Sequence, residues 1–308
     1  MLSGRCISCS ASVRGTLRVD VRVSLLFNEN AGDGVSLRQI CESLERHRHQ
    51  VTRVEQGDGC SRLLAEPCDL VVAAGGDGTV AAAARALAGR GIPLAILPLG
   101  TANNIAKSLG SSGPIDDLIG GWTSARRRPL DLGMVSGARG ERRFVEAVGG
   151  GLIPIGIAAT KALTAGNGRS QTLKPVDALR KYRETLLHLK PRQWTVSLDG
   201  VRTTGSFLLV EVLNTPSIGP NLVLSLDVNP SDGFFCVVMA MEEHREQLDG
   251  HLQHLIEGRS SELSLDSQPA RHVEIEGWHD MHVDDRVSLP EKAVVSVCIE
   301  PAAVQVLA

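Results

Sequence analysis

Two short glycine-containing segments carry the residue types best suited to chemistry in this chain. Residues 75–79 (GGDGT) follow an apolar run, and residues 98–104 (PLGTANN) follow a second one. A strand that runs through such a turn into a helix presents unpaired backbone N–H groups and a positive helix end, and both attract anions. Two turns of this kind in succession suit a polyphosphate. The alternative is an ordinary strand-to-helix turn that binds nothing.

The glycines and polar side chains of these turns define the expected contacts with a polyphosphate. Glycine allows close approach of the backbone to a ligand, and Asp77 and Thr79 remain as polar groups able to face it. Asn28 ends the first expected strand at the same sheet edge, although an Asx turn is its alternative. Asn103 and Asn104 either supply amide donors or cap a helix. The expected contact residues are Asn28, Gly75, Gly76, Asp77, Gly78, Thr79, Val80, Gly100, Thr101 and Asn103.

A polyphosphate site points to phosphoryl transfer, and Asp284 is the carboxylate expected to serve the acceptor. This reaction needs positioning, neutralisation of phosphate charge by Mg²⁺ and a carboxylate near the attacking hydroxyl. Period-two alternation places His282 and Asp284 on one strand face and Val283 toward the core. An exposed carboxylate at a strand end is the alternative for Asp284. Asp284 is therefore the candidate general base, and Asp285 is the fallback.

Taken together, the motifs resemble the catalytic domain shared by diacylglycerol kinases, sphingosine kinases and bacterial lipid kinases. GGDGT alone also resembles turns of NAD kinases and 6-phosphofructokinases, but NAD kinases lack an LGTxN turn at this spacing. Four further segments are similar to family motifs: residues 27–32 (FNENAG), 128–133 (RPLDLG), 229–234 (NPSDGF) and 283–286 (VDDR). The resemblance extends over about residues 22–307.

The resemblance assigns a role to Asp284 and also shows a departure beside it. The aspartate of the family motif V-D-G-E is the general base, and Asp284 matches it. Asp285 stands in place of the glycine and Arg286 in place of the glutamate. An adjacent carboxylate raises the pKa of Asp284, whereas an arginine lowers it. We therefore expect the two departures to act on this carboxyl in opposite directions.

The resemblance also implies a structural Mg²⁺ site. In bacterial members of the family, the loop that matches residues 229–234 holds this ion through an aspartate and neighbouring backbone carbonyls. The corresponding ligands here are the Asp232 carboxylate and the carbonyls of Asn229 and Phe234, and such oxygen ligands suit a hard cation. The residues by themselves indicate only a turn.

The function that the resemblance implies is that of an ATP-dependent lipid kinase acting on the hydroxyl of a diacylglycerol-type lipid. In this interpretation Asp284 and Asp77 are catalytic, Asp77 orients Mg²⁺ or the nucleotide, and the cofactors are ATP and Mg²⁺. One alternative is a catalytically weak nucleotide- or lipid-binding regulatory protein on the same fold, because Glu29, Asp285 and Arg286 depart from the family motifs. The other alternative is a kinase that acts on NAD or on a sugar.

The composition of the chain limits which partners and which cellular compartment we expect. The net charge of −3 gives no reason to expect nucleic-acid binding. The sequence has no apolar run of the ~18 residues that a membrane span needs, and its first twenty residues lack the apolar core of a signal peptide. Seven scattered cysteines fit reduced thiols in the cytoplasm. We expect a cytoplasmic protein that reaches lipid peripherally, and a homodimer is left open.

A basic segment offers one route to a membrane surface. Residues 161–192 contain eight Lys and Arg against two acidic residues. Such an excess attracts anionic headgroups, each basic residue contributing ~1 kcal/mol near the surface. A solvated helix face is the alternative interpretation.

The order of expected elements predicts two units. Strands alternate with helices from residue 21 to about 130, which predicts an α/β nucleotide-binding domain with a parallel sheet. From residue 131 to 291 short alternating strands predict a mainly antiparallel, lipid-substrate domain, with a strand expected at 222–228. We expect residues 1–20 to be a flexible tail and residues 110–121 to lie at the boundary. The alternative for residues 292–308 is that the chain returns there to the first domain.

Overall fold

The computed structural model describes most of the chain beyond its first twenty residues. The described residues are 21–32, 34–57, 60, 62–137, 140–165, 173–261, 263, 265–278, 280–288 and 294–308. The expected tail at residues 1–20 lies outside this set.

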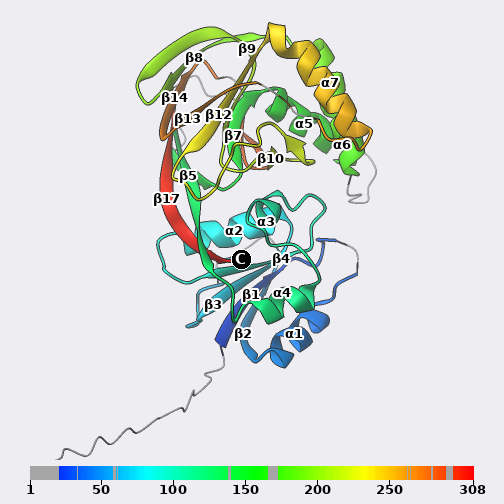
Figure 1. Ribbon diagram of the computed structural model, residues 1–308, viewed down its shortest axis with the longest axis vertical. Coiled ribbons are helices and arrows are strands. Elements are labelled where there is room, and N and C mark those ends of the chain that lie inside the picture. Colours follow the sequence, from blue (N-terminus) through cyan, green and yellow to red (C-terminus); the bar gives the residue numbers. More distant parts are fainter. Residues whose placement is uncertain are drawn as a thin grey trace, which may run out of the picture.

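The first part of the chain forms a parallel sheet that carries helices (Figure 1). Its strands run in the order β2-β1-β3-β4. The elements are β1 (Val21–Phe27), α1 (Leu37–Arg46), β2 (His49–Gln56), β3 (Leu70–Gly75), α2 (Asp77–Leu87), β4 (Leu94–Pro98), α3 (Asn104–Ser108) and α4 (Ile115–Gly121). β3 and β4 are continuous apolar runs because a parallel sheet covered on both faces buries nearly all of its side chains. A capping box between Ser36 and Gln39 begins α1.

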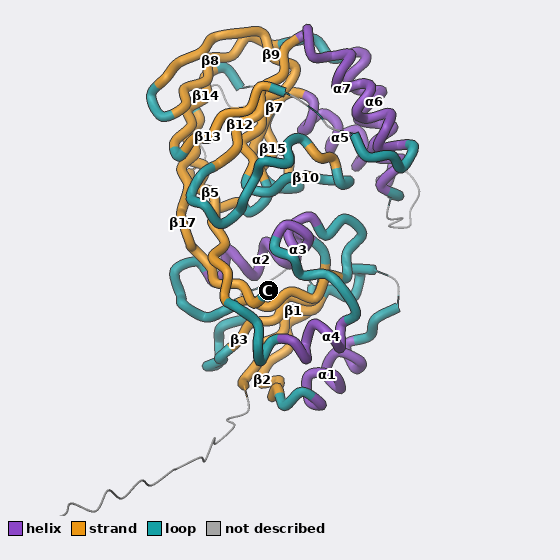
Figure 2. Tube along the Cα trace, viewed as in Figure 1, coloured by secondary structure: helices purple, strands orange, loops and turns teal. Residues whose placement is uncertain are grey.

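The second part is mainly antiparallel, with three α-helices against one side (Figure 2). Its first elements are β5 (Arg127–Gly137), β6 (Gly140–Phe144), β7 (Ala147–Gly151), α5 (Leu152–Ala165), α6 (Pro175–His188), β8 (Arg192–Leu198) and β9 (Val201–Leu213). Its later elements are β10 (Ser217–Ile218), β11 (Leu222–Val223), β12 (Phe235–Met241), a 3-10 turn (Glu242–His244), α7 (Arg245–Ile256), β13 (Asp266–Ala270), β14 (His272–Glu276), β15 (Met281–Val283), β16 (Arg286–Ser288) and β17 (Val295–Leu307).

The long strand β17 joins the two parts into one continuous sheet. Near its start it pairs antiparallel with β14, and at its end Val306 lies opposite Leu94 in a parallel pairing with β4. β5 runs antiparallel beside it over both regions. In Figure 1 this red strand passes from the upper part of the molecule into the lower part.

The predicted fold class is confirmed, while one local prediction is wrong. The parallel first sheet and the antiparallel second part have the predicted character. The strand expected at 222–228 is only the two-residue β11, because the chain then leaves the sheet and leaves Leu226 69% exposed. The expected boundary segment 110–121 contains helix α4, which begins after Pro114. This boundary and the two domain limits stay predictions.

Candidate functional site

The two glycine turns lie directly against each other at the carboxyl ends of β3 and β4. Leu99 N–H donates to the Gly75 carbonyl over 2.9 Å. A Cβ added to Gly100 would lie 2.4 Å from the Gly76 Cα, and one added to Gly75 would lie 2.3 Å from Thr79 Oγ1. Because real Cβ atoms do not approach so closely, these positions need glycine for packing as well as for any ligand.

One side of the turn pair is open. Apart from its chain neighbours and the backbone of its own helix, no described heavy atom lies within 4 Å of a Cβ built on Gly78, which is exposed. Thr101 on the second turn is exposed too. Gly76 is the N-cap of α2 and has no side chain to satisfy the N–H groups at the start of that helix. This open, glycine-lined end of α2 fits the phosphates of a nucleotide.

Asp77 connects the two turns. Its Oδ1 accepts a hydrogen bond of 2.9 Å from Ile105 N–H at the start of α3. Burial raises the pKa of Asp77, against the lowering effect of the backbone N–H groups of α3 and its N-cap. The carboxylate therefore holds α3 in place, which is a structural task that the sequence did not reveal.

Several other expected contact residues shape the turns from within. Asn103 has a left-handed backbone with φ 52°, and its Oδ1 accepts from Gly100 N–H at 2.9 Å. Asn28 forms an Asx turn, its Oδ1 accepting from Asn30 N–H at 3.0 Å, and its amide donates to Thr79 Oγ1 at 3.4 Å. Val80 packs in the core and its N–H donates to the Gly76 carbonyl.

Asp284 occupies the turn between β15 and β16, with a left-handed backbone of φ 52°. Its Oδ1 accepts hydrogen bonds from the backbone N–H groups of Val145 (3.0 Å) and Glu146 (2.9 Å). Its Oδ2 lies 2.7 Å from Arg85 Nη1. Burial raises the pKa of Asp284, and these donors together with the Arg85 charge lower it. The carboxylate is thus buried and fixed on both oxygens.

The predicted alternation around Asp284 is confirmed for the side chains, although β15 ends at Val283 and Asp284 belongs to the turn. His282 and Asp284 both line a cavity beside this turn, whereas Val283 packs in the hydrophobic core. All three side chains are buried. Asp285 alone of this group is exposed. The alternative of an exposed carboxylate at a strand end is wrong, because Asp284 is buried next to a cavity.

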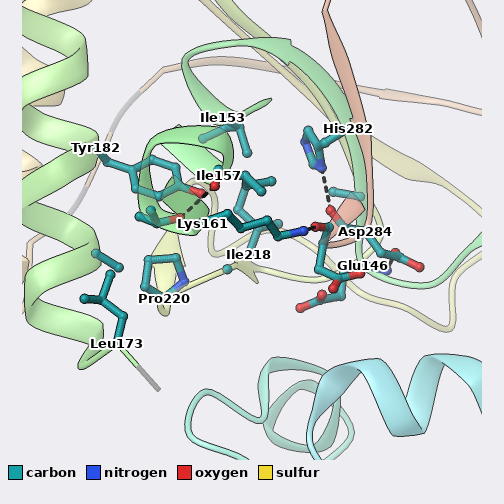
Figure 3. A pocket seen from close by; sticks show the side chains of 15 residues that line it. Glu146, Ile153, Ile157, Lys161, Leu173, Tyr182, Ile218, Pro220, His282 and Asp284 are labelled. Atoms are coloured by element: carbon teal, nitrogen blue, oxygen red, sulfur yellow. Dashed lines mark hydrogen bonds between the residues drawn. The ribbon is translucent and has the colours of Figure 1, made fainter. Parts of the chain in front are cut away.

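Next to Asp284, a buried pair of side chains joins β15 to β9. His282 Nε2 is 2.8 Å from Glu211 Oε2, and both side chains are at most 1% exposed. His282 Nδ1 lies 2.7 Å from the Asp284 carbonyl oxygen (Figure 3). Burial lowers the pKa of His282, but the Glu211 charge and the hydrogen bonds outweigh it and the pKa is raised. The imidazole therefore anchors the backbone of Asp284.

An apolar cavity of about 260 Å³ ends at Asp284 (Figure 3). Its walls come mostly from α5, α6 and the segment that follows β10. The apolar lining residues are Ala147, Ile153, Ile157, Leu173, Ala178, Ile218 and Pro220. Glu146, His282 and Asp284 form one polar end, and Tyr182 packs across Gly156 on the α5 side. The arrangement suits an apolar chain with a polar group directed at the carboxylates.

Glu146 is a site residue that the sequence did not indicate. It is buried, and its Oε1 accepts a hydrogen bond of 3.0 Å from Asn104 Nδ2 of α3. Burial raises the pKa of Glu146 well above its usual value, and the charges of Asp77 and Asp284 add to this. The row of three carboxyl groups therefore favours a proton on Glu146.

The loop expected to bind Mg²⁺ lies on the surface before β12. The exposed Asp232 accepts from Phe234 N–H at 2.9 Å, and Asn229 Oδ1 accepts from Ser231 N–H at 3.2 Å. Beneath it, Asp131 accepts 2.7 Å hydrogen bonds from Gly233 and Ala302. Among the described residues, no group of three or more His, Cys, Asp or Glu side chains is placed to hold a metal. One carboxylate with backbone carbonyls still fits a hard cation, so this site stays a prediction.

Comparison with known proteins agrees with this architecture. Residues 22–135 match the diacylglycerol kinase catalytic domain, and residues 154–308 match the YegS C-terminal NAD kinase beta sandwich-like domain. A diacylglycerol kinase of Mycobacterium tuberculosis is 28% identical over 93% of this chain and 94% of its own length. A Pseudomonas aeruginosa protein named as a probable YegS-like lipid kinase is 31% identical over 69% of this chain and 70% of its own.

Solved structures show the same fold. A diacylglycerol kinase from Bacillus anthracis superposes with a TM-score of 0.71 at 19% identity, over 95% of this chain and 98% of that one. The fold and the paired glycine turns thus define an α/β domain of the diacylglycerol kinase type followed by a β-sandwich-like domain. The chain belongs to the diacylglycerol kinase-like lipid kinase family. Within the residues that the structure describes, none of the helices is both long enough and apolar enough to span a bilayer.

Proposed function

We propose that this protein is an ATP-dependent lipid kinase that transfers the γ-phosphate to the hydroxyl of a diacylglycerol-type lipid. The observation that carries the proposal is the apolar cavity that ends at the buried Asp284 carboxylate. The open glycine-lined start of α2 supports the nucleotide half of the reaction. The names of the relatives, diacylglycerol kinase and YegS-like lipid kinase, support the same reaction class.

The proposed roles follow from position and chemistry. The backbone around Gly76, Gly78 and Gly100 receives the phosphates, because N–H groups at a helix start bind anions. The cavity holds an acyl chain and directs the lipid hydroxyl to Asp284, which accepts its proton. Mg²⁺, when bound, neutralises phosphate charge in this reaction class. Asp77 keeps α3 and the second turn in register with the first.

We also propose that the lipid is reached from the surface of a membrane facing the cytoplasm. Leu163 of α5 is 48% exposed, and Val287 of β16 is exposed as well. The exposed Lys161 and Arg286 lie on these same two elements, which contact each other. Apolar and basic side chains combined in this way bind the interface of an anionic membrane.

Replacing Asp284 by Asn tests the proposed reaction. The variant removes the proton acceptor, so kcat with diacylglycerol vesicles falls by about 10²–10⁴ while the KM for ATP changes little. Labelled ATP, with NAD and sugar phosphates as control acceptors, reads the activity, and thermal melting checks the fold. Asp285→Asn is the matched control, because Asp285 is exposed and its carboxylate adjoins the same turn. If Asp285→Asn abolishes turnover while Asp284→Asn is mild, the catalytic role belongs to Asp285.

A regulatory protein without efficient turnover is the second candidate. Asp284 is bonded to Arg85 in this structure, so a hydroxyl has to approach a carboxylate that already has a partner. Binding of ATP and of diacylglycerol without phosphate transfer, across a panel of lipid acceptors, would favour this candidate over the kinase.

A further inference from the structure

A single arginine connects the candidate base to the helix that begins at the phosphate turn. Arg85 lies in the last turn of α2, and its Nη1 is 2.7 Å from Asp284 Oδ2. The Arg85 side chain is 24% exposed and the Asp284 side chain 5%. The two residues are 199 positions apart in the sequence. The contact therefore joins the nucleotide-side helix to the lipid-side hairpin.

The surroundings of Asp284 make Arg85 the group that this carboxylate depends on. Burying an unpaired carboxylate is strongly unfavourable, so the charge needs a partner or a proton. Titratable and charged groups surround it on each element packed there: Arg85 of α2, Arg142 of β6, Glu146 before β7, Lys161 of α5, His282 of β15, Asp285 of the turn and Arg286 of β16. The Lys161 Nζ donates to the Asp285 carbonyl at 2.8 Å. Among the described residues, Arg85 alone donates a side-chain hydrogen bond to the carboxylate.

We propose that Arg85 is a positioning residue of the phosphoryl transfer, which holds the Asp284 carboxylate in place and ties it to α2. The inference rests on the proposed function, since it assigns Asp284 the role of proton acceptor. α2 is a stiff connection: Asp77 at its first position and Arg85 are eight residues apart, which is about 12 Å along a helix. The length of this helix and of the Arg85 side chain thus sets the spacing between the phosphate turn and the base.

The same contact keeps the base ready to accept a proton. Asp284 already has a raised pKa because it is buried, and the positive charge of Arg85 opposes this. Without Arg85 the pKa rises further, so a smaller fraction of the carboxyl is ionised near neutral pH. Activity that depends on the ionised form then appears only at higher pH.

The test compares Arg85→Met with the parent enzyme over a range of pH, using diacylglycerol in phosphatidylcholine vesicles. An opposite charge beside a carboxyl lowers its pKa by about 1–3 units, so loss of Arg85 lowers kcat most on the acidic side of the profile. The acidic limb of the kcat profile moves to higher pH, and the KM for ATP stays within about twofold. Arg85→Lys keeps the charge and restores most of the parent profile. If Arg85→Met does not fold, Arg85→Gln and Arg85→Lys give the same comparison.

Arg143→Met is the matched control. Arg143 of β6 forms an ion pair with Glu300 of β17 at 2.6 Å, away from the carboxylates of the site. We expect its loss to lower thermal stability without moving the pH profile. An Arg85→Met enzyme that behaves in the same way, with lower stability but an unmoved profile, would overturn the inference. If the Asp284→Asn variant remains active, the proposed function is overturned and this inference with it. If the Asp284→Asn variant is inactive but the pH profile of Arg85→Met does not move, the inference alone is overturned.

Discussion

Two glycines that face each other across the paired turns leave no room for a methyl group. A Cβ on Gly100 would approach the Gly76 Cα to 2.4 Å and Asn103 Oδ1 to 2.9 Å. Both contacts involve atoms that cannot easily move, since Gly76 is backbone and Asn103 is bonded to the turn. The contact therefore links the stability of the fold to the shape of the proposed nucleotide site.

Gly100→Ala is expected to lower both the stability of the fold and the affinity for ATP. Overpacking typically costs about 1–3 kcal/mol, and the displaced turn should bind ATP less tightly. Gly78→Ala is the informative partner, because a Cβ there meets open space: its melting temperature should stay near the parent value while ATP binding falls. Thermal melting and calorimetric titration with ATP measure the two effects. Unchanged ATP affinity in Gly78→Ala would mean that phosphates do not lie over this turn.

At the scale of single residues, the sequence singled out the glycine turns and Asp284 but did not reveal several of the residues that contact them. The glycine turns and Asp284 stood out because their local patterns are distinctive. Arg85 and Glu146 did not, since their roles arise from contacts that join distant parts of the chain. Asn103 was expected either to supply an amide donor or to cap a helix, and its side chain forms hydrogen bonds within its own turn. Residue type and local spacing do not tell which polar side chain turns inward.

The loop before β12 is an element whose predicted role has a direct test. If Asp232 anchors Mg²⁺, Asp232→Ala should lower the melting temperature in Mg²⁺ and change little in chelator, because only the metal-bound native state gains stability. That gain is about 2.7 kcal/mol when the ion is present at 100 times its Kd. Asp227→Ala, at another exposed aspartate nearby, is the control. An equal fall in the melting temperature of Asp232→Ala with and without Mg²⁺ would show that the loop is an ordinary turn.

Among the elements, those with clean periodicity were predictable and the glycine-rich ones were not. α6 buries Ala178, Leu179, Tyr182 and Leu186 at the spacing of one helix face, and β8, β9 and β14 follow alternating or apolar runs. β7 (AVGGG) escapes a pattern search because glycine disfavours strands. Its glycines are explained by neighbours from elsewhere: a Cβ on Gly149 would lie 2.0 Å from the Glu211 carboxyl carbon, and one on Gly150 would lie 2.4 Å from Trp278 Nε1.

At the scale of the whole molecule, Glu146 lies where α3 of the first part meets the second part. The folded state raises its pKa above the unfolded value of about 4.3, so the folded protein binds this proton more tightly. Stability from this group is therefore fully present below the unfolded pKa and is lost as pH rises through the folded pKa. Ionised Glu146 near Asp77 and Asp284 loosens the junction.

Glu146→Gln should accordingly match the parent protein in thermal stability near pH 4 and exceed it near pH 8. The amide keeps an oxygen to accept from Asn104 and stays neutral throughout. Exposed Glu243→Gln, made in parallel, should show no such divergence. Melting curves across this pH range provide the measurement. A constant offset between Glu146→Gln and the parent at every pH would show that charge at this position is not what destabilises the junction.

The pairing of β17 with β4 has a consequence for the synthesis of this protein on the ribosome. β4 has β3 on one side, and its other side is completed only by residues made roughly 200 positions later. At translation rates of about 5–20 residues per second, that edge waits on the order of 10–40 s for its partner. An apolar, unpaired edge is a template for aggregation during such an interval. Nascent chains of this protein should therefore engage chaperones until the final strand emerges, and synonymous changes that slow translation between β4 and β17 should lower its soluble yield.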